Sequence, residues 1–283
     1  MHFDALTLAC LAAELRDNLV GGRIQQVLAP DEQSIGLEIY AQRQRRYLLL
    51  VAGNRSARIH LVEQKLRRGV EQPSPLLLLL RKYVRESSLS AVIQPDPSER
   101  LLQLDFDHAE HGATTLVLEI LGARSNLLLL KAGGRILDCL HRIWPGEDSV
   151  RPQAPGQHYS PPPPQAKAPP VDDGSADYYM RLGAVVGSSE KLWRALVAGV
   201  AGVSPTLGRE TAWRATGDSE VRGQDADLLA IVHALQELWS PVQSGEWMPG
   251  YWREGDQVVG FSAYPAHLRG EFVAANSMSE AVE

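Results

Sequence analysis

Residues 23–61 decide the fold, and they read RIQQVLAPDEQSIGLEIYAQRQRRYLLLVAGNRSARIHL. The stretch alternates segments rich in β-branched, aromatic and leucine residues with short runs of turn-forming residues. Because the connections are only a few residues long, they favour antiparallel hairpins over crossovers through a helix. The predicted strands are residues 23–27, 34–40, 45–51 and 57–61.

A helix is predicted on the N-terminal side of this stretch, over residues 4–19. Asp4 can cap its start, leucines recur at helical spacing, and Gly21-Gly22 ends it. On the C-terminal side, a second helix starts near Ser74-Pro75, and a further series of strands follows it. These strands are predicted at residues 89–94, 100–106, 114–121, 125–130 and 135–140.

The period of the apolar residues changes after a proline-rich linker at residues 161–174, where the polyproline conformation excludes helix and sheet. Helices are then predicted at residues 190–200, 205–215 and 225–239, and a strand pair at 246–253 and 258–261. The predicted class is α+β. Its parts are a β-rich domain (1–160), the linker (161–174), a helical domain (175–245) and a small hairpin region (246–283). Residues 277–283 resemble a capped helix start that is cut off, so we expect a truncated protein.

The charge distribution argues against a protein that binds nucleic acid by bulk attraction. The 283 residues include 28 Lys and Arg against 34 Asp and Glu, a net charge of −6. Two cysteines exclude a disulfide framework and favour a reducing, cytoplasmic compartment. No basic n-region precedes an N-terminal apolar stretch, and no apolar run has the roughly 20 residues of a membrane span.

Motifs for metal or cofactor chemistry are absent from the sequence. It has no CxxC, HExxH, P-loop, Rossmann fingerprint or GxSxG elbow. The only close histidine pair, His108 and His111, falls in the turn between two predicted strands, so a polar hairpin tip is the better interpretation than a metal site. We therefore predict no catalytic residue, no metal and no cofactor.

The turn Gly202-Val203-Ser204 is the sharpest local signal. Gly202 permits a tight turn, Ser204 can cap the next helix, and Pro205 fits its first position. Such a helix–turn–helix leaves backbone N–H groups and a positive helix end that can hold a phosphate. An ordinary helical hairpin is the alternative.

Two further segments carry charged residues at strand ends. Glu99-Arg100 precedes a strand, where a carboxylate can orient a guanidinium toward phosphate, or the pair can be a simple exposed ion pair. Glu119-Ile120-Leu121 ends a strongly apolar strand. If Glu119 is buried there, it requires a partner.

Taken together, these segments resemble the N-terminal region of the NFACT family, also known as fibronectin-binding protein A N-terminal domains. The resemblance covers essentially the whole chain. It rests on residues 2–8, 15–16, 20–24, 56–61, 73–84, 99–100, 119–126, 134–138, 155–159, 202–205 and 277–282.

The resemblance implies a fold similar to formamidopyrimidine-DNA glycosylase, with a β-rich domain followed by a helix–two-turn–helix unit. Full-length members continue into a coiled coil and an RNA-binding domain. They bind the large ribosomal subunit blocked by peptidyl-tRNA, recruit alanyl-tRNA and promote alanine tailing of the stalled nascent chain. The family's tRNA-contacting positions fall on Glu99, Arg100, Glu119, Ile120 and Leu121, with Glu99 in place of Asp and Leu121 in place of Met.

Two other functions follow from the same resemblance. The family name suggests a surface adhesin that binds fibronectin, against which the missing signal peptide and low cysteine count argue. The glycosylases use an N-terminal proline amine as nucleophile, and this chain has His2-Phe3 instead. A base-excision reaction is therefore not expected.

Overall fold

The structure is a computed structural model that describes residues 3–54, 56–67, 69–146, 150–175, 177–267 and 270–283. The chain divides into two compact units, each assembled from separate parts of the sequence. The sheet unit comprises residues 11–95, 100–163 and 283, and the helical unit comprises residues 1–10, 96–99 and 164–282. The sequence predicts four consecutive parts, with boundaries at residues 160, 174 and 245. That division remains a prediction.

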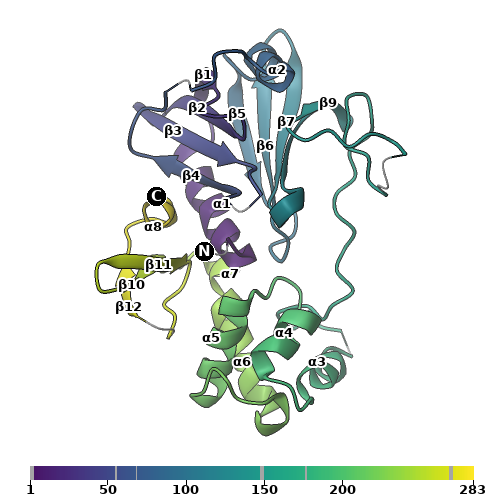
Figure 1. Ribbon diagram of the computed structural model, residues 1–283, viewed down its shortest axis with the longest axis vertical. Helices are drawn as coiled ribbons and strands as arrows, with labels where there is room; N and C mark the ends of the chain where they lie inside the picture. The colour runs from purple at the N-terminus through teal and green to yellow at the C-terminus, as the bar shows by residue number, and fades with distance from the viewer. Residues whose placement is uncertain (1–2, 55, 68, 147–149, 176, 268–269) are drawn as a thin grey trace. The chain divides into compact units, whose positions relative to one another are not determined.

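The sheet unit contains a nine-stranded antiparallel sheet (Figure 1). The strand order is β4-β3-β2-β1-β5-β6-β7-β8-β9, so apart from the β1–β5 contact each strand pairs with its neighbours in sequence. All nine predicted strands are present, with ends within two residues of the prediction. They are β1 (Arg23–Leu28), β2 (Ser34–Ala41), β3 (Gln44–Val51), β4 (Arg58–Val62), β5 (Ser88–Ile93), β6 (Leu101–His108), β7 (Gly112–Glu119), β8 (Asn126–Lys131) and β9 (Arg135–Cys139).

The sheet has a short seam where β1 meets β5. Among the described residues, one pair, Arg23 with Ser88, is in register there, whereas β6 and β7 pair over eight residues. Backbone hydrogen bonds at the junction run from Gly21 N to Leu89 O (2.8 Å), from Leu89 N to Gly22 O (2.9 Å), from Ile24 N to Ser87 O (2.9 Å) and from Glu86 N to Ile24 O (2.8 Å). The sheet therefore consists of a β1–β4 half and a β5–β9 half.

Two leucine-rich helices add buried side chains to the core that the strands of the sheet unit form. α1 (Ala5–Leu19) gives this unit its residues after Cys10, of which Leu11, Leu15 and Leu19 are fully buried. α2 (Pro75–Tyr83) begins at the predicted cap, because the Ser74 hydroxyl accepts a hydrogen bond from Leu77 N. α2 packs against both β1 and β9, which lie far apart in the strand order, so the sheet curves around this helix.

The helical unit holds the remaining helices and a three-stranded sheet of order β11-β10-β12. The predicted helices are confirmed as α4 (Leu192–Gly199), α5 (Pro205–Thr216) and α6 (Leu228–Trp239), and the strand pair as β10 (Gly250–Glu254) and β11 (Gln257–Ser262). The helix start expected at residues 277–283 is present as α8 (Met278–Val282). Three further elements were not predicted: α3 (Tyr178–Val186), α7 (Pro241–Ser244) and β12 (Glu271–Ala274).

The helix caps of this unit follow the sequence. The Asp4 carboxylate accepts from Thr7 N at the start of α1 (2.8 Å), and the Ser277 hydroxyl accepts from Glu280 N in α8 (3.1 Å). α3 escaped prediction because aromatic and β-branched residues and a central Gly183 lower its helix propensity. Across the described residues, no helix combines the length and apolarity needed to cross a membrane.

Candidate nucleic-acid interface

The end of the sheet where β6 begins and β7 finishes brings several predicted site residues together. Ile120 N donates to the Arg100 carbonyl at 2.9 Å, and Leu101 pairs with Glu119 across the strands. The 3-10 turn Gly122–Arg124 follows directly. Arg100 and Glu119–Leu121, which are 19 or more residues apart in sequence, therefore lie side by side in the sheet unit.

Exposure divides these residues into two groups. The Arg100 and Arg124 side chains are exposed, and Leu121 is half-buried, whereas Ile120 is only 3% exposed. Arg100 forms no ion pair or side-chain hydrogen bond with any residue that the structure describes. The turn itself is rigidly held, since the Ser125 hydroxyl accepts from Leu121 N and donates to Gly122 O. We call Arg100, Leu121 and Arg124 the sheet-end surface.

Glu119 is buried, as its apolar strand suggested, and it has the partner that burial requires. One carboxylate oxygen accepts from Arg151 and from the Tyr159 hydroxyl (2.9 Å), and the other accepts from Gln153 Nε2 (2.9 Å). The carboxylate is 1% exposed and the Arg151 side chain is 19% exposed. Burial, together with the charge of Glu119, raises the pKa of Tyr159 well above its usual value. Glu119 thus anchors residues 151–159 to β7.

The network around Glu119 extends through a second buried polar pair. Asn126 Nδ2 donates to the Gln153 side-chain oxygen and to the His141 carbonyl, each at 2.8 Å. Sequence reasoning assigned no role to Arg151, Gln153 or Tyr159. The one signal in the sequence that pointed to these residues was Glu119, because a carboxylate in an apolar strand needs hydrogen-bond donors. The sequence does not indicate where in the chain those donors lie.

In the helical unit, the turn between α4 and α5 is packed tightly. Gly202 has φ +72°, and a Cβ added there would lie 2.7 Å from Trp239 Cη2 and 3.0 Å from Ser98 Cα. The Ser204 hydroxyl caps α5 by accepting from Leu207 N, and it donates to the Asp4 carboxylate, both at 3.1 Å. Val203 is buried. These internal contacts explain why a glycine, an apolar residue and a serine occur in this turn. Phosphate binding by Gly202, Val203 and Ser204 remains a prediction.

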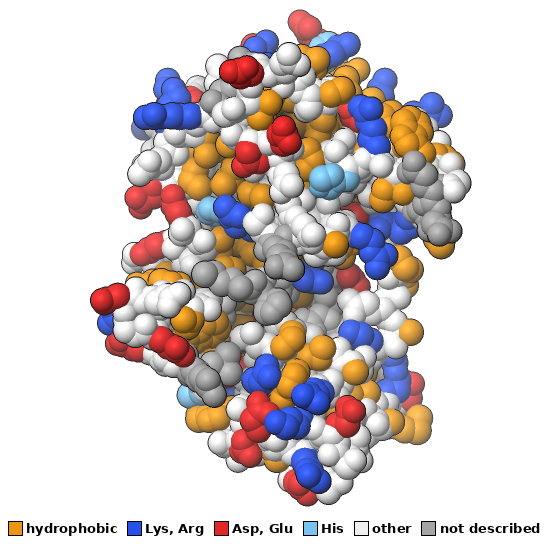
Figure 2. Space-filling model, viewed as in Figure 1, with side chains coloured by type: hydrophobic (Ala, Val, Ile, Leu, Met, Phe, Trp, Pro, Cys, Tyr) orange, Lys and Arg blue, Asp and Glu red, His pale blue; other side chains and the backbone are white. Residues whose placement is uncertain are grey.

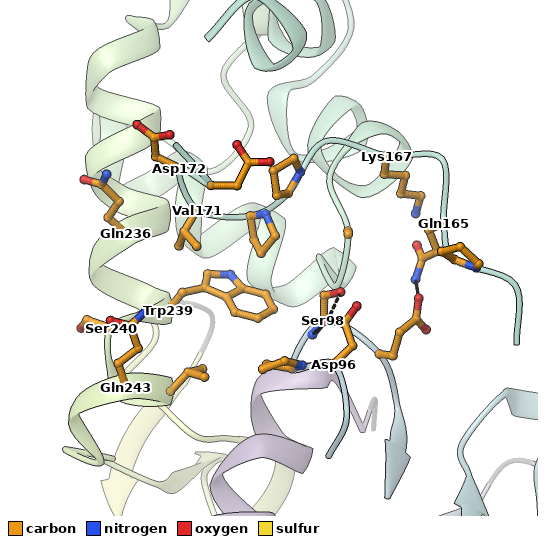
Figure 3. A pocket seen from close by; sticks show the side chains of 18 of the residues that line it. Asp96, Ser98, Gln165, Lys167, Val171, Asp172, Gln236, Trp239, Ser240 and Gln243 are labelled. Carbon is orange, nitrogen blue, oxygen red and sulfur yellow. Dashed lines mark hydrogen bonds between the residues drawn. The ribbon is translucent and has the colours of Figure 1, made fainter. Parts of the chain in front are cut away.

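A pocket of about 650 Å³ opens beside this turn, entirely within the helical unit (Figure 3). Glu99 lines it and accepts a hydrogen bond from Gln165 Nε2 at 3.1 Å. Its other walls come from the proline-rich segment, the loop before α3, and α6 with α7. The neighbours Glu99 and Arg100 therefore belong to different compact units.

The histidine pair occupies a hairpin tip, as predicted. His108 ends β6, and its Nδ1 accepts from the backbone N–H groups of Glu110 and His111. The two imidazole rings stack with centroids 4.6 Å apart. Over the described ranges, no cluster of three His, Cys, Asp or Glu side chains could hold a metal ion. His2, on which the comparison with the glycosylase nucleophile rests, lies outside the described residues.

Comparison with known proteins identifies the family. A family model described as NFACT N-terminal and middle domains matches residues 4–283. The Rqc2 homolog RqcH of Streptococcus pneumoniae serotype 2 is 33% identical over 168 residues, which is 58% of this chain and 30% of that protein. RqcH of Bacillus subtilis is 27% identical over 287 residues, covering 100% of this chain and 48% of that protein. The chain thus spans less than half the length of these relatives.

A solved structure shows the same fold. The N-terminal part of the fibronectin/fibrinogen-binding protein from Streptococcus suis superposes with a TM-score of 0.78 at 24% identity, over 99% of this chain and 97% of that one. The predicted α+β class is confirmed by this likeness and by the sheet and helices described above. By the match over residues 4–283, this chain belongs to the NFACT family.

Proposed function

We propose that this chain is the tRNA-binding N-terminal part of a ribosome-associated quality-control factor, and that the sheet-end surface contacts the tRNA. Membership of the NFACT family and relatives named RqcH support the proposal. Of the five positions that the family resemblance assigns to tRNA contact, all except Glu99 are neighbours in the sheet unit: Arg100 and Glu119–Leu121.

The observation that carries the proposal is the exposed guanidinium of Arg100. It projects from the start of a strand, has no acidic partner among the described residues, and has the exposed Arg124 at the same sheet end. Guanidinium groups bind phosphate with two parallel hydrogen bonds, which makes such a surface suited to a nucleic-acid backbone.

The remaining predicted contacts have different roles in this proposal. Leu121 is half-exposed and available for apolar contact with a base, whereas Ile120 is buried and can act only indirectly. Glu119 acts indirectly by holding the strand end and residues 151–159 in place. Glu99 and the turn Gly202-Val203-Ser204 lie in the helical unit, where their contact with tRNA is a separate proposal.

Surface charge limits how strong the interaction can be. On the face shown in Figure 2, Lys and Arg side chains are interspersed with Asp and Glu side chains. With a net charge of −6, the chain gains little from general attraction to RNA. Binding should therefore depend on a few local contacts, and its salt dependence should be shallow because few phosphates are neutralised.

The activity of the complete protein is a wider proposal. We infer that it acts in the cytoplasm on the large ribosomal subunit carrying peptidyl-tRNA, recruits alanyl-tRNA and promotes alanine tailing, without catalytic residues or a cofactor in this part. A fibronectin-binding adhesin is the alternative that the names of related structures suggest. Binding of the purified chain to immobilised fibronectin tests that alternative directly.

The test of the tRNA site is Arg100→Glu, with Lys131→Glu as the matched control. Lys131 is exposed at the opposite end of β8, and both substitutions change the net charge by the same amount. In gel-shift titrations with bulk tRNA, Arg100→Glu should weaken binding by about 1–3 kcal/mol, and the control should have a much smaller effect. Equal losses in the two variants, at unchanged thermal stability, would refute the sheet-end surface as the contact.

A further inference from the structure

The pocket of the helical unit combines apolar walls with acidic groups. Its walls include Pro97, Pro169, Pro170 and the indole of Trp239, which crosses the middle of the pocket (Figure 3). Prolines and an indole present flat, rigid apolar surfaces that can hold an extended aliphatic or peptide segment at little entropic cost.

Three carboxylates line the pocket without a salt bridge to any cation in the described part of the chain: Asp96, Asp172 and Asp173. Each uses one oxygen for the backbone of its own loop. Asp96 accepts from Ser98 N at 2.8 Å, Asp172 from Gly174 N at 2.9 Å, and Asp173 from Ser175 N at 3.0 Å. Their second oxygens can therefore accept from a ligand.

The cations of the same pocket donate hydrogen bonds to backbone carbonyls, and Arg181 also interacts electrostatically with Asp173. Lys167 Nζ donates to Val197 O at 2.9 Å, and Arg181 Nη2 donates to Lys167 O at 3.0 Å. With Glu99 included, the lining holds four acidic and two basic side chains, which gives a formal charge of −2. A phosphate group would be repelled here, and a cationic group would be attracted.

Trp239 provides an independent indication of a ligand. Trp239 is only 5% exposed, yet its indole N–H has no acceptor among the residues that the structure describes. Gly202 fixes the far edge of the ring, because any Cβ at that position would overlap Trp239 Cη2. The nitrogen-bearing edge faces the side of the pocket where Val171 lies (Figure 3). A buried donor without an acceptor is uncommon in proteins, and a ligand that supplies an acceptor would satisfy it.

We propose that this pocket binds a peptide segment that carries arginine or lysine. A peptide supplies both missing components, because a backbone carbonyl can accept from the Trp239 N–H while a cationic side chain reaches the carboxylates of Asp172 and Asp173. The aliphatic stem of that side chain would lie along the prolines. This function is additional to tRNA binding, since it uses no residue of the sheet-end surface.

The probe is an acetylated, amidated hexa-arginine peptide, titrated into the ¹⁵N-labelled chain. The indole resonances of the six tryptophans are followed, and Trp239 is assigned by its loss in Trp239→Phe. The Trp239 resonance should shift on titration. The double variant Asp172→Asn/Asp173→Asn should weaken the fitted affinity roughly fivefold or more, since it removes two charge-assisted acceptors.

The matched control is Glu254→Gln/Asp256→Asn, which removes two exposed acidic groups from the turn between β10 and β11 of the same unit. It should leave the affinity within about twofold of the parent, as expected for distant exposed charges. Equal weakening by the two double variants, or a Trp239 resonance that does not move, would overturn the proposal. A Trp239 shift with oligouridine and none with the peptide would also overturn it in favour of a nucleic-acid site.

The other five indole resonances would reveal whether Asp172→Asn/Asp173→Asn is folded. If it is not, titrating the wild-type chain with hexa-arginine and with hexa-glutamate tests whether the pocket recognises positive charge. Hexa-arginine alone should shift Trp239, and an equal shift with hexa-glutamate would refute recognition by charge.

Discussion

Replacing Glu119 by alanine tests whether this residue anchors the fold or contacts the ligand. The substitution deletes the shared acceptor of Arg151, Gln153 and Tyr159. Gln153 is 3% exposed, so its amide loses an acceptor that water cannot easily replace. Arg151 keeps access to water at 19% exposure and contributes less. The buried Gln153 amide and the partly buried Tyr159 hydroxyl both lose their acceptor. At roughly 1–3 kcal/mol for each donor, the expected loss in the free energy of unfolding is about 3 kcal/mol.

Urea unfolding followed by circular dichroism measures this loss, with Glu110→Ala as the control. Glu110 is an exposed acid at the hairpin tip of the same sheet, and its removal should change stability by less than about 0.5 kcal/mol. Glu119→Gln retains the shape and part of the hydrogen bonding, and it should cost roughly 1–2 kcal/mol.

A stability of Glu119→Ala within about 0.5 kcal/mol of the parent would refute the anchoring role, since that range is typical of exposed sites. The tRNA affinity of the still-folded Glu119→Gln variant separates the two roles further. A loss of affinity as large as that of Arg100→Glu, without a comparable change in stability, would mean that Glu119 contacts the tRNA directly.

Three other outcomes follow from buried groups. Gly202→Ala combines a left-handed φ with overlap onto Trp239 and should lower the free energy of unfolding by about 2–3 kcal/mol. Gly133→Ala, with φ +86° and open space around it, should lower it by only about 1 kcal/mol. Equal shifts of the two variants in thermal melts would contradict the packing argument. Burial lowers the pKa of His60 to about 4, so the unfolded chain takes up the proton first and stability falls as the pH drops below 6.5. Between about pH 7.5 and pH 5 the loss should be roughly 2 kcal/mol, and a His60→Leu variant with the same slope in urea titrations would rule it out. Burial raises the pKa of Cys139 to about 12, so Ellman's reagent should modify this thiol only after unfolding, and rapid labelling of the folded protein would disprove that.

The sequence predicts most of the secondary structure because the relevant signals are local. Turn residues separate the strands, and the hydroxyls of Ser74, Ser204 and Ser277 cap helices at the expected positions. The elements that escaped prediction have weak local signals. α3 has a composition typical of a strand, and β12 has only four residues.

The site could be predicted only in part, because its geometry is tertiary. Glu119 required a donor, but Arg151 follows 32 residues later, after β8 and β9, so no spacing rule selects it. Likewise, nothing local relates Ser98 to Trp239, although both pack against Gly202. The pair Glu99-Arg100 is continuous in sequence, yet its members belong to different compact units. Contact partners of this kind follow from the whole fold and not from any window of residues.

The short seam between β1 and β5 has a kinetic consequence. Within each half of the sheet, successive strands pair with their sequence neighbours, so most contacts in a half are local in the chain. Low contact order favours rapid folding, and each half can nucleate without waiting for the other. The contacts at the seam, Arg23 with Ser88 and Gly22 with Leu89, close a longer loop and bring fewer hydrogen bonds in return. We therefore expect the joining of the halves to follow their formation, so that the seam governs how fast the sheet comes apart more than how fast it forms.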